Sequence, residues 1–194
     1  MSRALAAVLV LLTFGCLAPR QPAEPRFFSP GGAVAMTASA PRAEPTGPEL
    51  RLRRVFAADY LRNCMVWRRG VEVGFYDLLR WTEPPSHFVQ ARIEQELFER
   101  RGLRRAARPS ARLLTVELLA FDDVLEPTHE GVVSLRVLLV DPPHVAALDR
   151  SFTTRRPIAS DDPEEVARAL GEALSEAIGQ IGAAVEDALG NGLP

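Results

Sequence analysis

The sequence predicts an α+β fold in two layers, with a mainly antiparallel sheet and two amphipathic helices packed on one of its faces. Two observations predict it. Segments of strand character lie on both sides of a helical segment near residue 90, and the chain ends in a longer helix. Each helix has only one apolar stripe, so packing both helices on one sheet is the economical way to bury these stripes.

The composition is that of a globular protein and argues against a nucleic-acid partner. The 194 residues are 47% hydrophobic and 25% charged, and the formal net charge is -2. Nucleic-acid-binding domains usually carry a strong basic excess, which this chain lacks. The part of the chain after residue 48 is large enough to bury one core of its own, so one folded domain is expected.

The first 15 residues resemble a bacterial lipoprotein signal peptide. Arg3 gives a positive start, residues 4–14 are uncharged and largely apolar, and Gly15 precedes Cys16. The apolar run is too short for a transmembrane helix, which needs roughly 20 residues. We therefore expect cleavage between Gly15 and Cys16 and acylation of Cys16, which would hold the protein at a membrane. The alternative is an ordinary secretory signal in which Cys16 is incidental.

Residues 16–48 predict a tether with one docking point. This segment is rich in proline, alanine and glycine and has few large apolar residues, so it cannot bury enough surface to become ordered. Its aromatic pair, Phe27-Phe28, favours a short strand over residues 26–29 that docks on the domain edge. The alternative is that the two rings are an exposed apolar site within the linker, with no fixed place on the domain. The domain itself is expected over residues 49–190.

Several segments of the domain have strand character. The run over residues 65–75 predicts two strands around a tight turn at Gly70, with Val71, Val73 and Phe75 on one face. Two leucine- and valine-rich runs predict an antiparallel hairpin, and a further strand follows it. The strands outside the Gly70 turn are expected at residues 49–56, 112–125, 132–140 and 151–158.

Two helices are predicted. The first begins with Ser86 as N-cap and stops at Gly102. The second begins with Asp162 as N-cap and Pro163 in the first helical position. Apolar residues trace one face of this second helix: Val166, Leu170, Leu174, Ile178, Ile181, Val185 and Leu189.

Residues 1–194 contain no sequence motif of a known catalytic or metal site. The three histidines, at positions 87, 129 and 144, fit no metal-ligand pattern, and no serine lies in a nucleophile elbow. The densest polar cluster lies at one end of the predicted hairpin. Acidic turns of this kind are usually solvated, so we expect no enzyme activity, no metal and no cofactor. The cluster comprises Asp122, Asp123, Glu126, His129 and Glu130.

The dipeptide Arg80-Trp81 stands just ahead of the first helix and is followed by Pro84-Pro85. In the structural interpretation, Trp81 covers the edge of the core and the prolines fix the entry to the helix. In the alternative, Arg80 and Trp81 form a partner-binding corner, because tryptophan and arginine are favoured at interface hot spots.

Together these features resemble the ABC-type transport auxiliary lipoprotein family, the PqiC-like proteins. Members carry a lipobox cysteine, an early aromatic pair, and an Arg-Trp followed by prolines ahead of a helix. In this chain those are Cys16, Phe27-Phe28, and Arg80-Trp81 with Pro84-Pro85. The resemblance covers about residues 26–189.

The resemblance implies a non-catalytic docking component. Family members accompany envelope transporters that combine an ABC ATPase, a permease and an MCE-domain protein, and that move lipids or other hydrophobic molecules between the two membranes of diderm bacteria. By this resemblance the chain would be anchored through Cys16 to the periplasmic face of the outer membrane. It would receive the MCE assembly there, as a single subunit or as one unit of a homo-oligomeric ring. Two alternatives stay open: a lipoprotein scaffold of another envelope machine, such as a secretion or cell-wall complex, and a periplasmic hydrolase that uses Asp122, Asp123 and His129.

Overall fold

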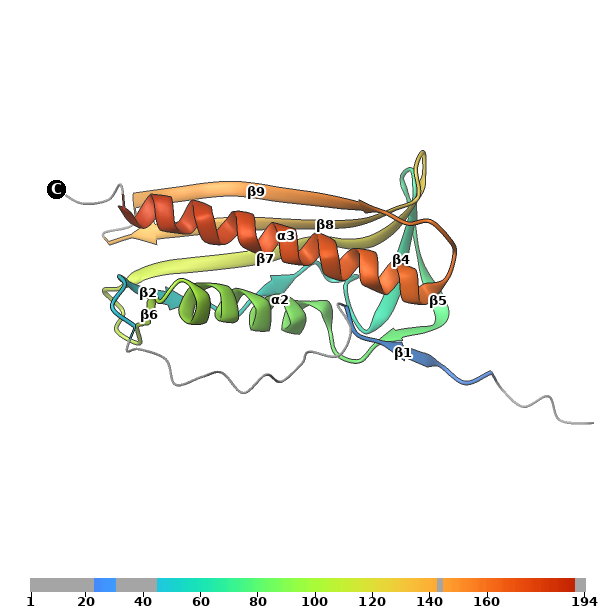
Figure 1. The fold of residues 1–194 in the computed structure, drawn as a ribbon, viewed down its shortest axis with the longest axis horizontal. Coiled ribbons are helices and arrows are strands. Elements are labelled where there is room, and N and C mark those ends of the chain that lie inside the picture. The colour runs from blue at the N-terminus through green and yellow to red at the C-terminus, as the bar shows by residue number, and fades with distance from the viewer. Residues whose placement is uncertain (1–22, 31–44, 143–144, 191–194) are drawn as a thin grey trace, which may run out of the picture.

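The computed structural model describes residues 23–30, 45–142 and 145–190, which form one mixed nine-stranded sheet with two helices on one face (Figure 1). The predicted α+β class is confirmed. The longest ladders are antiparallel, whereas the short strands join the sheet in parallel. Within the described residues, neither helix combines the length and hydropathy that a bilayer crossing requires. The strands are β1 (Arg26–Phe28), β2 (Glu49–Leu52), β3 (Phe56–Ala57), β4 (Cys64–Arg69), β5 (Glu72–Trp81), β6 (Arg104–Arg105), β7 (Arg112–Glu126), β8 (Glu130–Asp141) and β9 (Val145–Pro157).

The predicted hairpin is the centre of the sheet. Strands β7 and β8 pair antiparallel from Leu113↔Val140 to Val124↔Glu130. Strand β9 begins at Val145, earlier than the expected start at residue 151, because it pairs with β8 along almost its whole length. The alanine-rich start of β9 carries little strand propensity of its own, so only this pairing reveals it.

The single strand expected over residues 49–56 is divided into β2 and β3. Both pair in parallel with β7, but the chain leaves that ladder between them. At the break, the Val55 N–H donates to Oε1 of Gln90 on α2 at 2.8 Å, and the Val55 side chain is buried. A contact with a helix therefore replaces strand pairing at this point.

Strand β5 is irregular where β1 joins it. Cys64 pairs with Arg80, whereas Val66 pairs with Phe75, so β5 carries extra residues between these two pairs. The Arg80 guanidinium donates to the carbonyls of Tyr76, Asp77 and Leu79 at 2.8, 2.7 and 3.1 Å. These hydrogen bonds satisfy backbone acceptors at the irregularity.

Strand β1 extends the sheet beyond β5, in the segment where the sequence predicts a docked strand. It pairs in parallel with residues 79–81, with Phe28 opposite Trp81. The Phe28 carbonyl also accepts the Thr82 N–H at 2.9 Å, and the Phe28 side chain is buried. The folded body therefore includes residues 26–28.

Helix α3 (Pro163–Gly190) lies across β7, β8 and β9 and begins as predicted. The Glu164 N–H donates to Oδ1 of Asp162 at 3.0 Å, which makes Asp162 the N-cap. All seven predicted stripe residues are buried. Gly131 of β8 lets the helix come close, since an added Cβ there would lie 3.1 Å from the Leu170 nitrogen.

The prediction that Ser86 caps the first helix is wrong. Helix α2 (Pro85–Glu94) begins two residues earlier than a Ser86 cap would place it, and its N-cap is Pro84, with no side-chain cap. Proline at the first helical position has its φ already fixed and no N–H to satisfy, so the helix does not need a hydroxyl cap. The helix continues as a π-helical turn over Gln95–Arg100, and Gly102 ends it with φ 68.

Candidate functional site

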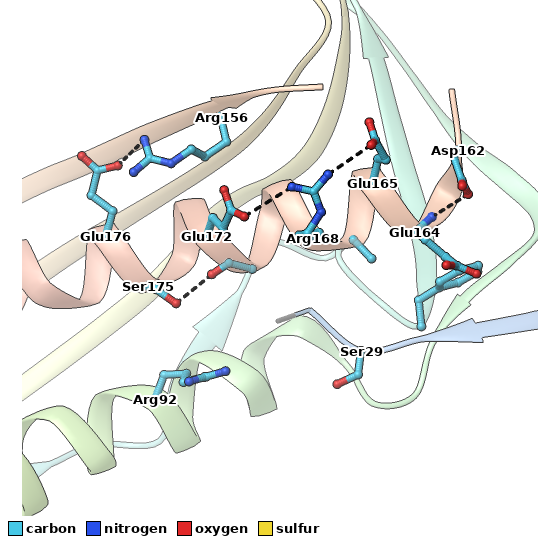
Figure 2. A pocket seen from close by; sticks show the side chains of 13 residues that line it. Ser29, Arg92, Arg156, Asp162, Glu164, Glu165, Arg168, Glu172, Ser175 and Glu176 are labelled. Carbon is cyan, nitrogen blue, oxygen red and sulfur yellow. Dashed lines mark hydrogen bonds and ion pairs between the residues drawn. The ribbon is translucent and has the colours of Figure 1, made fainter. Parts of the chain in front are cut away.

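A charged cleft of about 1200 Å³ opens between the N-terminal half of α3, the end of β1 and α2 (Figure 2). Its floor is one face of α3, where Ala167, Gly171 and Ser175 follow each other at four-residue spacing. The Ser175 hydroxyl donates to the Gly171 carbonyl at 2.8 Å, so its proton is used within the helix. The floor therefore carries only small side chains. The charged groups that could bind another molecule lie on the walls of the cleft.

Ion pairs cover the wall formed by α3 and β9. Arg168 pairs with Glu165 at 3.1 Å and with Glu172 at 3.5 Å. Arg156 of β9 pairs with Glu176 at 2.7 Å. These side chains are partly exposed, so the pairs contribute little to stability but give the wall alternating charges.

Arg92 faces this wall from α2 (Figure 2). It is half-buried and, among the described residues, has no hydrogen-bond or ion-pair partner. A half-buried guanidinium without a carboxylate is a ready partner for an acidic group brought by another molecule. The cleft thus suits a polar, charged protein surface and holds no arrangement of nucleophile and base among the described side chains that line it.

Trp81 and Arg80 are engaged within the chain. The Trp81 side chain is 1% exposed and packs edge-on against Phe121 and Phe88, with ring centroids at 5.2 and 6.4 Å. The Arg80 guanidinium is bound to carbonyls of β5 as described above. The contacts of Trp81 agree with its structural interpretation, and partner binding by Arg80 and Trp81 at this corner stays a prediction.

The acidic hairpin cluster does not converge on one point, because Asp122 and Asp123 make separate sets of contacts. Asp122 is buried and accepts from Nε of Arg68 at 2.8 Å and from the Tyr60 hydroxyl at 3.1 Å. Burial, together with the Asp122 carboxylate, raises the pKa of Tyr60 to about 12. Glu126 and Glu130 pair with arginines on neighbouring strands.

Asp123, by contrast, binds Tyr76 and His129. The Tyr76 hydroxyl donates to Oδ2 of Asp123 at 2.6 Å, and Nε2 of His129 lies 2.8 Å from Oδ1. Burial raises the pKa of Asp123, although the bonds from Tyr76 and His129 oppose this. Nδ1 of His129 also lies 3.6 Å from Asp161, ahead of α3. The network ties the hairpin to the start of α3, and the described residues contain no group of three potential metal ligands.

The sequence did not reveal the cleft or the role of Arg92. Arg92 belongs to the polar side of α2, where it resembles any solvated arginine. The end of β1 forms one side of the cleft where β1 docks beside α3, and Arg26 pairs with Glu164 there at 3.4 Å. The predicted cleavage and lipidation residues, Gly15 and Cys16, lie outside the described residues.

Comparisons with known proteins agree with this fold. A family model described as "ABC-type transport auxiliary lipoprotein component" matches residues 33–182. Among solved structures, protein XCC0632 from Xanthomonas campestris has a TM-score of 0.72 at 17% identity, over 86% of this chain and 97% of that one. The structure of an uncharacterised protein gives a TM-score of 0.62 at 17% identity, over 84% and 99%. A minor lipoprotein from Acinetobacter baumannii reaches only 0.41 at 13% identity, over 75% and 95%. No curated protein matches the chain.

Proposed function

The chain belongs to the family of ABC-type transport auxiliary lipoprotein components, and from this premise we propose that it is a non-catalytic docking component of an MCE/ABC-type system. In this proposal Cys16 carries the acyl chains and holds the protein on the periplasmic face of the outer membrane. The domain then receives the periplasmic MCE assembly, whose ATPase and permease supply the work of moving a lipid or another hydrophobic solute.

The family match over residues 33–182 is the observation that carries this proposal. Two features of the domain support it. The polar residues of the hairpin end are each held by partners within the chain, which favours a structural role over catalysis. The cleft offers an accessible charged surface of a size suited to a protein segment.

We assign the docking surface to the cleft, with Arg92 as its central contact. Charged groups across an interface fix its register and speed its formation. An acidic residue of the partner would pair with Arg92, and basic residues would meet Glu172 and Glu176 on the opposite wall. Binding through such contacts weakens as ionic strength rises.

Co-purification from membranes tests the proposal. The wild-type protein should bring an MCE-domain protein with it at low salt, and Arg92→Glu should reduce the recovered partner by at least tenfold. Arg53→Glu is the matched control, because Arg53 is exposed and lies outside the cleft. Recovery of wild-type levels of partner with Arg92→Glu overturns the cleft assignment. Recovery of a secretion or cell-wall complex without an MCE protein supports the alternative scaffold.

A further inference from the structure

The turn of the β4–β5 hairpin exposes apolar side chains at one end of the molecule. Val71 is 101% exposed, Phe75 is 49% exposed and Val73 is 37% exposed. In Figure 1 this turn projects beside the β7–β8 turn, at the end opposite the C-terminus of α3. These three residues form a surface that we call the hairpin tip, with Val73 and Phe75 on the same face of β5, and the folding of the domain does not require it to be apolar.

Trp67 lies below the hairpin tip, on the opposite face of the hairpin from Val73 and Phe75, with its ring against Gly74. The Arg69 guanidinium lies 5.9 Å from the centre of this ring. Aromatic rings beside polar groups are typical of the boundary between lipid headgroups and acyl chains, where an amphipathic ring has both environments in reach. Above Trp67, in the turn, Val71 is the outermost apolar group.

The length of the chain before β1 lets the anchoring residue reach the same end of the molecule. Strand β1 pairs with residues 79–81, beyond the irregular part of β5, and in Figure 1 the described residues before Arg26 run away from the sheet rather than along β5. Arg26 pairs with Leu79, and Val71 lies eight residues before Leu79, a rise of about 26 Å in a strand. Cys16 lies ten residues before Arg26 and can reach about 35 Å. The anchoring residue can therefore reach the level of the hairpin tip.

We propose that the hairpin tip inserts into the same lipid surface that holds the acyl chains of Cys16. This inference rests on the lipid anchor of the proposed function. The acyl chains supply the affinity, since two of them already give stable attachment. The tip adds a second point of contact, which fixes the orientation of the domain and turns the C-terminal end of α3 away from the membrane.

The basic residues near the tip are paired with acidic ones, so the proposed contact is apolar rather than electrostatic. Arg69 pairs with Glu126 at 3.3 Å, and Arg68 pairs with the buried Asp122 at 2.7 Å. Glu72 is exposed and, among the described residues, has no ion-pair partner. The tip has no basic excess, so insertion does not need anionic lipids and does not weaken with salt.

Quenching by brominated lipids tests the inference on the mature lipoprotein in phosphatidylcholine vesicles. Val71→Trp places a reporter at the tip, and Val145→Trp is the matched control. Val145 is 65% exposed and pairs with Asp141, at the opposite end of β8 from the hairpin turns. Bromine on the upper acyl chain should quench the Val71→Trp fluorescence at least twofold more than that of Val145→Trp, equally at low and high salt. Val73→Asp with Phe75→Asp should remove the excess quenching.

Flotation of the same vesicles separates the two proposals. Cys16→Ser should abolish flotation, and flotation of that variant would overturn the lipid anchor. If the wild-type protein floats while both tryptophan reporters are quenched equally, the anchor stands and the tip contact is wrong. A blue shift of Val71→Trp emission that grows with protein concentration in the absence of vesicles assigns the tip to a second copy and also overturns the membrane contact.

Discussion

The ring of Trp67 lies over Gly74, its cross-strand partner on β5, so closely that an added Cβ at position 74 would overlap the ring. The ring of Trp67 thus occupies the space that a side chain at position 74 would fill. This arrangement sets the shape of the β4–β5 hairpin below its exposed turn.

Gly74→Ala tests this relationship. The new methyl group must push the ring of Trp67 aside, because the contact is with a rigid ring on the neighbouring strand. We expect a loss of about 1–3 kcal/mol in the free energy of unfolding, the usual cost of overpacking. Urea denaturation measures the loss. The displaced ring of Trp67 should meet more water, so the tryptophan emission of the folded protein should shift to the red, while Trp81 stays buried. Unchanged stability and emission would contradict the close packing of this pair.

Two glycines of α3 should respond differently to replacement by alanine. A Cβ at Gly179 meets nothing within 4 Å, so Gly179→Ala should stabilise the protein by up to about 1 kcal/mol through helix propensity. A Cβ at Gly182 would overlap the ion-paired side chains of Arg101 and Glu96. Gly182→Ala should therefore be less stable than Gly179→Ala in thermal unfolding, and equal effects would refute this account.

The helix starts give a second matched pair of variants. Asp162→Ala removes the acceptor of the Glu164 N–H and should cost about 1 kcal/mol. Ser86→Ala should leave stability within about 0.5 kcal/mol, because Pro84 and not Ser86 precedes the first helical residue. Urea denaturation of both variants measures these differences. A larger loss for Ser86→Ala than for Asp162→Ala would restore the serine cap predicted from the sequence.

Asp123 should make stability depend on pH. Burial raises its pKa in the folded state above the ordinary value of about 3.9. Its contribution to the free energy of unfolding is fully present below about pH 3.9 and is lost as the pH rises through the folded pKa. Asp123→Asn removes this titration, so the variant should gain stability relative to the wild type as the pH rises across that window.

Asp149 is the control for this pH dependence. Its hydrogen bonds to Arg136 lower its pKa. Its contribution is therefore present above about pH 3.9 and is lost as the pH falls through the folded pKa, so Asp149→Asn should lose stability relative to the wild type as the pH rises. Urea denaturation from acid to neutral pH measures both trends. Slopes of the same sign would contradict the assigned environments.

Elements with their own periodicity and caps could be predicted from the sequence. Helix α3 has seven apolar positions on one face and a capping aspartate before a proline, and every one of these signals is local. The β7–β8 hairpin likewise carries its leucines and valines in both strands. In these segments the residues adjacent in the sequence are enough to indicate the structure.

Features that depend on distant partners could not be predicted. The break between β2 and β3 depends on the Val55 N–H meeting Gln90, 35 residues away. The split of Asp122 from Asp123 depends on Tyr60, Arg68 and Tyr76 of other strands and loops. The cleft depends on the docking of β1 beside α3. Each of these is decided by tertiary contacts that leave no periodic mark in the sequence.

Strand β1 also determines how the proposed membrane attachment responds to tension. While Arg26–Phe28 stays paired with β5, a pull on Cys16 acts on a leash of ten residues, about 35 Å at full extension. Among the described residues, the next point held to the domain is Gly47, whose N–H donates to the Gly102 carbonyl at 3.1 Å, so detachment of β1 could lengthen the leash to at most about 110 Å. Three paired residues separate under a smaller force than the long β7–β8 and β8–β9 ladders. Stretching of the envelope would therefore detach β1 before it unfolds the domain.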